Sequence, residues 1–253
     1  MKFDFWEAQG EGFKLFSQFC HVGDWNAILD ALTEALTPRK ETARPMAILD
    51  VGCGYGYNTL AILKRSYCQH EFRHTVDLVE PSMAALEHAK AVLSTEPYGG
   101  FRRHAVRTIG DLPYGSYDRI LYIHSAYYVQ DLLKELRYLK EKHAYDHTRL
   151  IFLCLSQSSK FYKPSGSILP NCKEDISAIL DRLGAPYSIN RVMTSRLILP
   201  DLSCLTHKGM KALKAFMGAN DVEDSTFANR MRKITSDNKI DFEDHLICAE
   251  FPD

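Results

Sequence analysis

The chain has 253 residues, of which 45% are hydrophobic and 25% charged, and its formal net charge at pH 7 is -1. This length allows one large α/β domain or two small ones, and the composition is that of a globular protein. The near-neutral charge and the absence of Lys/Arg runs argue against a nucleic-acid or anionic-membrane surface. Because no apolar stretch exceeds strand length and the N-terminus has no signal pattern, we expect no membrane span and no secretion.

Strand-length apolar runs alternate with amphipathic segments along the sequence. This predicts a doubly wound α/β fold, with a mostly parallel, seven-stranded Rossmann-like sheet and helices on both faces. In chain order the predicted elements are a helix at 25–36, a strand at 46–51, a helix at 58–65, a strand at 75–80, a helix at 81–93, strands at 101–106 and 119–123, a helix at 130–143, a strand at 150–155, a helix at 173–183, and strands at 188–198 and 242–251.

Seven isolated cysteines occur, with no C-x-x-C pair among them. An odd number of scattered thiols fits buried cysteines in a reducing cytosol better than a disulfide framework. None has the paired spacing of a zinc ligand. We therefore expect free thiols, no metal and a cytoplasmic protein.

A glycine-rich loop follows the first predicted strand, with Gly52, Gly54 and Gly56 after Asp50. Such a loop at the carboxyl end of a strand forms a cradle for a small ligand, because glycine lets the ligand approach the backbone closely. Glu80 ends the second predicted strand, where it is placed to accept hydrogen bonds from both ribose hydroxyls of a nucleoside.

The spacing of this loop separates two kinds of nucleoside cofactor. A dinucleotide motif, G-x-G-x-x-G, needs a third small residue at position 57 for close helix packing, but Tyr57 stands there. The spacing is instead G-x-G-x-G, and Asp50 can serve the ammonium group of a methionine moiety. We therefore predict S-adenosyl-L-methionine as the cofactor. The alternative is a glycine turn that binds no ligand.

Residues 45–156 resemble the class I S-adenosylmethionine-dependent methyltransferases. Besides the loop and Glu80, the segments 110–113 and 117–121 look like the approach to that family's fourth strand. The resemblance implies that the adenine packs near Thr108 and Ile123. Pro81 joins the predicted cofactor site beside Glu80, or simply starts the next helix.

Within that class the chain is most similar to histamine N-methyltransferase-like enzymes. The segments 79–82, 117–129 and 242–246 carry this similarity, together with Phe13 and Phe16 before the first helix. It implies transfer of a methyl group to a nitrogen of a small amine or imidazole. Polar residues of the N-terminal segment, of the fourth strand's end and of the last strand would hold the substrate.

Carried over position by position, these substrate-binding sites fall on Asp24, His124 and Asp244. The family pattern has an amide where His124 and Asp244 stand, and Asp24 is out of register with the family's acid. Histamine itself is therefore not implied, whereas a small cationic or nitrogenous substrate is.

His124 is also the predicted catalytic base. Methyl transfer from a sulfonium is an in-line displacement, and a protonated amine has no lone pair to offer. A histidine can take up a proton near neutral pH, and His124 lies at the carboxyl end of a strand, where the ligand crevices of such sheets form. The alternative is a buried histidine bonded to backbone.

Aromatic and polar neighbours complete the predicted acceptor site. Tyr127 and Tyr128 could wall the pocket, with Tyr128 also assigned to catalysis, or they could belong to the core or rim. Asp244 and His245 could attract a cation, although solvation of an edge strand explains them as well. Phe16 is assigned to substrate binding as part of an aromatic lid, the alternative being helix docking. The lid would comprise Phe3, Phe5, Trp6, Phe13 and Phe16.

Two histidine pairs have the spacing of metal ligands. Residues 70–74 match H-E-x-x-H, and His143 and His147 are also four apart. That spacing binds zinc only on one face of a helix, and both pairs fall at the ends of predicted elements. No metal site is therefore predicted.

The sequence thus predicts one methyltransferase domain over residues 1–253. It would comprise an N-terminal helical or lid segment at 1–44, a cofactor-binding core at 45–156, and C-terminal strands at 157–253 with a helical insert at about 204–235. The expected partner is a small-molecule acceptor, with no nucleic acid and no membrane. The alternatives are an O- or protein methyltransferase on the same scaffold, or a non-catalytic cofactor-binding module.

Overall fold

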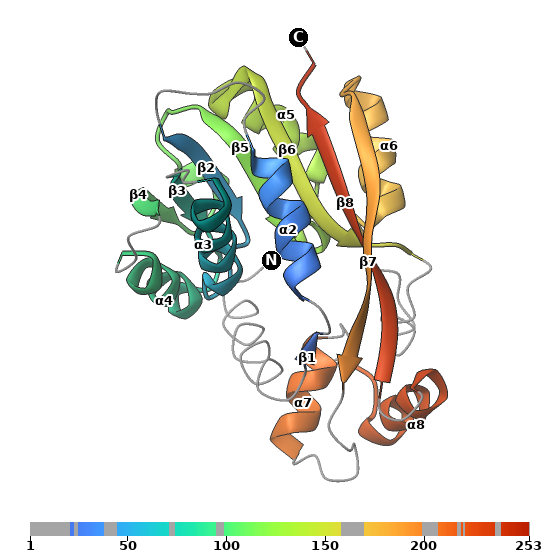
Figure 1. The fold of residues 1–253 in the computed structure, drawn as a ribbon. Coiled ribbons are helices and arrows are strands. Elements are labelled where there is room, and N and C mark those ends of the chain that lie inside the picture. Colours follow the sequence, from blue (N-terminus) through green and yellow to red (C-terminus); the bar gives the residue numbers. More distant parts are fainter. Residues whose placement is uncertain are drawn as a thin grey trace.

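The computed structural model describes residues 21–22, 25–37, 45–70, 74–94, 99–157, 170–198, 207–216, 219, 221–235 and 239–252. An eight-stranded sheet forms its centre, with the strand order β1-β7-β8-β6-β5-β2-β3-β4 (Figure 1). Seven of these strands are the predicted ones. The additional strand, β1 (His21–Val22), has two residues and pairs antiparallel with β7 at the sheet edge.

Five neighbouring strands make up the parallel part of the sheet. They are β2 (Met46–Val51), β3 (His74–Val79), β4 (Gly99–Val106), β5 (Tyr117–Ile123) and β6 (Ala144–Leu155). Every residue of β2 and β5 is buried, as expected for strands that are covered on both faces. The mostly parallel, doubly wound arrangement predicted from the sequence is thereby confirmed.

The last two strands extend the sheet on the side of β6. The strand β8 (Lys239–Glu250) runs antiparallel between β6 and β7 (Tyr187–Ile198). Leu155, the last residue of β6, pairs with Asp244, whereas β7 and β8 stay paired as far as Lys239. The β7–β8 ribbon therefore continues past the carboxyl edge of the parallel strands.

Helices cover both faces of the sheet (Figure 1). One face carries α2 (Trp25–Leu36), α3 (Tyr57–His70) and α4 (Met83–Ser94), and the other carries α5 (Leu132–His143) and α6 (Lys173–Leu183). The predicted insert between β7 and β8 contains α7 (His207–Phe216) and α8 (Asp224–Ile234). Because these helices connect the extended ends of the ribbon, the insert lies on the carboxyl side of the sheet.

The alternation of side chains along each strand divides the apolar core between the two faces. Leu121 and Ile123 of β5 pack with α2, α3 and α4, whereas Ile120 and Tyr122 pack with α5 and α6. The Tyr122 ring stacks on Phe152 with centroids 5.0 Å apart. In α2, Ile28 and Leu32 are at most 1% exposed, and each such side chain contributes about 2 kcal/mol through burial.

Two elements, α3 and β6, are longer than predicted, because each continues through residues that are exposed to solvent. The helix α3 continues to His70, five residues beyond the predicted end, through the exposed Cys68 and Gln69. The strand β6 begins at Ala144, six residues before the predicted start, and its exposed residues 145–147 lie where the register against β5 shifts. Hydrophobic patterning detects the buried portion of an element and misses its solvated end.

The described part of the chain contains no helix with the length and apolarity needed to cross a membrane. Its five described cysteines are free thiols: Cys53, Cys68, Cys154, Cys172 and Cys248. Within these same residues no three or more His, Cys, Asp or Glu side chains gather in a way that could hold a metal ion.

Candidate cofactor and acceptor site

The glycine loop after β2 lies at the carboxyl edge of the sheet, and its three glycines have φ angles of +76°, +54° and +79°. A Cβ on Gly52 would lie 2.4 Å from the Cβ of Ser125, and one on Gly56 would lie 2.9 Å from the Cα of Ala89 in α4. These two glycines therefore permit close packing within the protein. Among the described residues, no atom lies within 4 Å of a Cβ built on Gly54, so within this part of the chain the glycine faces open space.

Glu80 follows β3 and is held against the same loop. The backbone N–H of Gly54 donates to Oε2 at 3.0 Å, and the N–H of Ser82 donates to Oε1 at 2.9 Å. These two bonds fix the orientation of the Glu80 carboxylate, which offers about four acceptor sites in all. The acid is thus held against the backbone of Gly54.

Asp50 lies in β2 below the loop and is 2% exposed. The hydroxyl of Thr59 in α3 donates to its Oδ2, whereas its Oδ1 is buried with no hydrogen-bond partner among the described residues. Burial raises the pKa of Asp50 to about 6, the Thr59 bond opposes this shift, and the charge of Glu80 adds to it. A buried carboxylate oxygen without a donor is costly, so this position favours a ligand that brings one.

The short helix η2 (Ala126–Tyr128) follows β5, and its two tyrosines, Tyr127 and Tyr128, have different surroundings. Tyr128 is 37% exposed, and partial burial together with the charge of Glu80 raises its pKa to about 12. Tyr127 is buried, and its hydroxyl accepts the backbone N–H of Leu155. The same hydroxyl lies 3.4 Å from Nδ1 of His124, so one turn connects the surroundings of Glu80 with those of His124.

His124 ends β5 with a φ of +54°. This left-handed conformation is uncommon for a residue with a side chain and is found preferentially at functional sites. Its Nε2 lies 3.4 Å from Oδ1 of Asp244 in β8, and about a third of its side chain is exposed. Burial lowers the pKa of His124, and the Asp244 carboxylate opposes that shift.

The last strand, β8, contains Asp244 and His245, which the sequence assigned to one substrate site. Their side chains lie on opposite faces of the sheet. Since β8 lies between β6 and β7, the alternative of a solvated edge strand is wrong. Asp244 is fully buried and lies beside His124. Side chains alternate along a strand, so His245 lies on the α6 face, where burial and the charge of Lys173 lower its pKa. The structure thus brings Asp244 to His124 and takes His245 away from it.

Three further residues predicted to bind the cofactor surround the ends of β3, β4 and β5. The Pro81 carbonyl accepts two hydrogen bonds from the Arg107 guanidinium, at 2.8 and 2.6 Å. The exposed Thr108 hydroxyl donates to Asp111 at 2.8 Å. Ile123 is 7% exposed and belongs to the core under α2, α3 and α4.

Two predicted substrate-binding residues, Phe16 and Asp24, lie outside the described residues, as does the predicted aromatic lid. The histidine pairs are divided between elements: His70 ends α3 and His74 begins β3, while His143 ends α5 and His147 lies in β6. His74 is buried and shares a 2.7 Å hydrogen bond with Ser66. Neither pair therefore has the single helix face that zinc-binding spacing requires.

Two residues that sequence reasoning missed support the loop. The hydroxyl of Ser125 donates to the carbonyl of Val51, and its Cβ fills the space that a side chain at Gly52 would need. Thr59 supplies the hydroxyl on Asp50. The available signal for Thr59 was a hydroxyl in the first turn of the helix after the loop, whereas Ser125 lies too far along the chain to be linked to Gly52.

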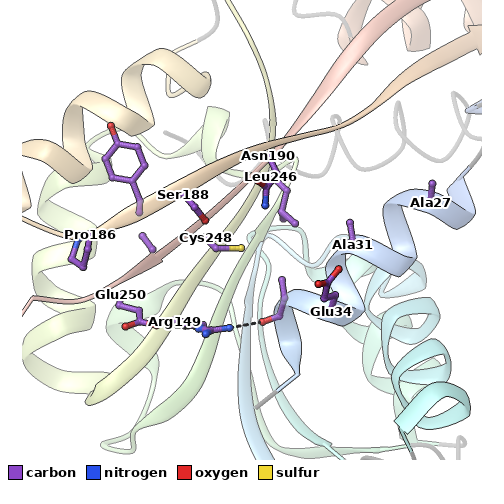
Figure 2. A pocket seen from close by; sticks show the side chains of 13 residues that line it. Ala27, Ala31, Glu34, Arg149, Pro186, Ser188, Asn190, Leu246, Cys248 and Glu250 are labelled. Carbon is purple, nitrogen blue, oxygen red and sulfur yellow. Dashed lines mark hydrogen bonds and ion pairs between the residues drawn. The ribbon is translucent and has the colours of Figure 1, made fainter. Parts of the chain in front are cut away.

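A separate cavity of about 640 Å³ lies between α2 and the β7–β8 ribbon, as Figure 2 shows. Ala27 and Ala31 of α2 face it, and Arg149 lies at its base, donating to Glu250 at 3.2 Å and to the Ala35 carbonyl at 3.4 Å. None of the predicted site residues lines this cavity, so it is distinct from the loop and from His124.

A doubly wound sheet with a glycine loop after one strand and a held acid after the next defines an α/β protein of the nucleoside-binding class. The family model described as Methyltransferase domain matches residues 24–165, which is more than half of the chain. The chain belongs to this methyltransferase domain family.

Solved structures share the fold at low identity. The YcgJ protein from Bacillus subtilis has a TM-score of 0.58 and 13% identity, covering 90% of this chain and 99% of that one. The [4+2]-cyclase SpnF has a TM-score of 0.55 and 15% identity over 89% and 80%. The geranyl diphosphate C-methyltransferase from Streptomyces coelicolor A3(2), in complex with Mg²⁺, geranyl diphosphate and S-adenosyl-L-homocysteine, has a TM-score of 0.51 and 14% identity over 89% and 80%. No curated protein matches the sequence significantly.

Proposed function

We propose that this methyltransferase transfers the methyl group of S-adenosyl-L-methionine to a nitrogen of a small amine- or imidazole-containing molecule. The main support for S-adenosylmethionine as the cofactor is a single observation, the arrangement of three groups at one edge of the sheet. Gly54 faces open space, Glu80 is oriented beside it, and Asp50 holds a buried oxygen without a donor.

These groups fit the parts of S-adenosylmethionine one by one. Glu80 would accept the ribose hydroxyls, and Asp50 would take the ammonium of the methionine moiety as its missing partner. The backbone at Gly54 would lie against the cofactor, with Thr108, Ile123 and Pro81 at the adenine end. When bound, the cofactor supplies a methyl group on a positively charged sulfonium, which a nucleophile displaces in line.

The acceptor side of the proposal rests on the turn after β5. Tyr128 lies within the electrostatic reach of Glu80, and Tyr127 of the same turn contacts His124. An acceptor beside Tyr128 and His124 would therefore lie next to the cofactor and would have a base at hand. Nitrogen as the acceptor atom rests on the resemblance of segments 79–82, 117–129 and 242–246 to histamine N-methyltransferase-like enzymes.

A small-molecule acceptor is favoured over nucleic acid or a membrane by the near-neutral net charge of -1. The free thiols fit work in the cytoplasm. The segment 1–44 and the insert at about 204–235 are proposed as covers of the acceptor site, because the insert joins the β7–β8 ribbon on the carboxyl side of the sheet.

Two measurements test the proposal in sequence. Calorimetric titration should show binding of S-adenosylmethionine, and labelled cofactor should then transfer its methyl group to members of a panel of small amines and imidazoles. Cofactor binding with transfer only to oxygen acceptors or to protein would contradict the nitrogen assignment. Absence of cofactor binding would contradict the whole proposal.

Two other functions have support of their own. An O- or protein methyltransferase would use the same cradle and the same base, since neither discriminates nitrogen from oxygen. The other alternative is a protein that binds the cofactor without transferring its methyl group, or that catalyses another reaction. The fold that this chain shares with the [4+2]-cyclase SpnF favours this alternative. The acceptor panel distinguishes the first alternative, and retained cofactor binding without any transfer would favour the second.

A further inference from the structure

We propose that Asp244 positions His124 as the base that takes the acceptor's proton, and that the acceptor is therefore a neutral N–H or O–H group. This inference rests on the proposed methyl transfer and narrows its substrate class. Ammonium groups and acceptors that carry no proton, such as tertiary amines, fall outside that class.

The contacts of the imidazole ring determine which of its nitrogens can accept a proton. The Tyr127 oxygen accepts the Leu155 N–H, so its own O–H is the proton available to donate to Nδ1. Nε2 lies 3.4 Å from Oδ1 of Asp244, an ion-pair contact in which a carboxylate favours a ring proton on the facing nitrogen. The ring proton of neutral His124 therefore resides on Nε2. Nδ1 keeps its lone pair and faces the Tyr127 hydroxyl at 3.4 Å.

An acceptor molecule can displace the Tyr127 hydroxyl from Nδ1 of His124, whereas the fold holds the Asp244 carboxylate in place beside Nε2. An O–H to N distance of 3.4 Å is long for a hydrogen bond, and Tyr127 does not need this contact to stay in place, because its oxygen also accepts the Leu155 N–H. Asp244 is fully buried in a central strand and cannot turn to solvent. An acceptor N–H or O–H can thus take the place of the Tyr127 hydroxyl at Nδ1, through the exposed third of the His124 side chain.

The proposed step balances in atoms and charge. The acceptor's lone pair forms a bond to the methyl carbon while the carbon–sulfur bond breaks, and the sulfonium becomes a neutral thioether. The proton of the acceptor passes to Nδ1 of His124, and the resulting imidazolium is paired with Asp244. Asp244 touches neither substrate nor cofactor, so it acts as a positioning residue, as the buried acid does in a Ser-His-Asp triad.

The acceptor class follows from the strength of this base. Burial lowers the pKa of His124, and the one charged group that acts on the ring among the described residues is Asp244, with Tyr127 as its titratable neighbour. An aliphatic ammonium has a pKa about four units above that of an ordinary imidazole, so His124 cannot deprotonate it efficiently at neutral pH. A neutral N–H or O–H loses its proton only as the methyl group arrives, and it therefore suits a weak base.

Nitrogen-detected NMR of the histidine rings tests the position of the proton without any acceptor. In the intact protein, His124 should be the Nε2–H tautomer. Asp244→Asn should lower the pKa of His124 and weaken this preference, whereas the matched control Glu243→Gln, one residue away in β8, should change neither. An Nδ1–H tautomer, or a His124 titration that Asp244→Asn leaves unchanged, would overturn the positioning role.

Transfer to matched acceptors tests the substrate class. With labelled cofactor, imidazole and aniline should be methylated at least 10-fold faster than their proton-free partners 1-methylimidazole and N,N-dimethylaniline, and faster than benzylamine. His124→Asn, which tolerates the left-handed backbone, should reduce transfer at least 100-fold while cofactor Kd changes less than twofold. Equal rates for the proton-free partners, or full activity of His124→Asn, would overturn the inference. Failure of the cofactor to bind would instead remove the proposed function, and the NMR result would still decide the role of Asp244.

Discussion

Two carboxylates at the cofactor end of the sheet differ because their surroundings differ. Glu80 accepts two backbone N–H groups and is fixed in orientation. Asp50 has one hydroxyl partner and one buried oxygen that finds no donor in the described part of the chain, and its pKa is raised to about 6. Glu80 is therefore oriented to accept hydroxyls, whereas the ligand affinity supplied by Asp50 depends on its ionisation.

Replacing Glu80 should affect binding far more than a surface substitution does. Glu80→Ala removes the acceptor proposed for the ribose and leaves the N–H groups of Gly54 and Ser82 without their carboxylate. We expect the Kd for S-adenosylmethionine to rise at least 100-fold, since charged hydrogen bonds are worth about 1.5–3 kcal/mol each. Calorimetry on Glu80→Ala and on the control Glu87→Ala, an exposed residue of α4 that pairs with Lys90, measures this effect. Equal affinities in the two variants would contradict the ribose assignment.

The ionisation of Asp50 should make cofactor binding depend on pH. The ammonium needs the ionised carboxylate, and with a pKa of about 6 only about a tenth of the free protein is ionised at pH 5. We expect the affinity for S-adenosylmethionine to rise about tenfold from pH 5 to pH 7 and then to level off. Asp50→Asn should bind weakly at every pH, and calorimetry at three pH values checks both proteins.

The raised pKa of Asp50 also makes the stability of the free protein depend on pH. Here the dependence is opposite to that of cofactor affinity, because stability falls as pH rises. Because the folded-state pKa of Asp50 is raised above its unfolded value of 3.8, its contribution to stability is greatest at low pH and declines as pH rises from about 4 to 6. Two pKa units correspond to about 3 kcal/mol. Asp50→Asn should remove this decline, and a wild-type-like pH dependence in that variant would show that other groups cause it.

At the scale of elements, the glycine loop combines two physical requirements in one short segment. Gly52 and Gly56 let the loop pack against Ser125 and Ala89, whereas Gly54 leaves space above the backbone. The loop is thus a junction between β2, α4 and the turn after β5. Its open central position is the one available to a ligand.

Alanine substitutions should separate these requirements. Gly56→Ala places a Cβ 2.9 Å from the α4 backbone at a φ of +79°, so it should lower the free energy of unfolding by roughly 3 kcal/mol. Gly54→Ala meets no protein atom and should cost about 1 kcal/mol in stability while raising the cofactor Kd at least 10-fold. Urea unfolding and calorimetry give the two quantities. If Gly54→Ala bound the cofactor normally, the cofactor would not lie against this glycine.

At the scale of the whole molecule, the candidate site is assembled from distant parts of the chain. Asp50 lies in β2, Glu80 follows β3 and His124 follows β5 in the parallel sheet, and Asp244 comes from the antiparallel β8 near the C-terminus. The β7–β8 ribbon contributes to the core as well as to the site, since Leu246 packs under α2 and Ile247 packs under α6. A ligand bound there should therefore stabilise the entire domain.

Thermal unfolding measures that global stabilisation. At a cofactor concentration 1,000 times the Kd, binding adds about 4 kcal/mol, which for a chain of this size raises the Tm by roughly 10 °C. The shift should be largely absent in Glu80→Ala. A Tm that does not respond to saturating S-adenosylmethionine would contradict the cofactor site.

Prediction from the sequence worked best where local rules apply. The helix α2 and the strand β2 begin and end at the predicted residues, because their apolar patterns mark them. Asp50, the glycines and Glu80 were found by their spacing. His124 and Asp244 were proposed as separate substrate contacts, and their mutual contact was not foreseen, because 120 residues of chain separate them.

The sequence by itself determined the order of strands and helices, the glycine loop and the acid after the second core strand, since each depends on residues close together in the chain. Only the tertiary structure decided which glycine faces open space, that Asp50 keeps an oxygen without a donor, and that β8 is a central strand. It also brought Asp244 to His124 and moved His245 to the other face of the sheet. These outcomes depend on packing and strand order between distant segments, which local propensity and periodicity do not encode.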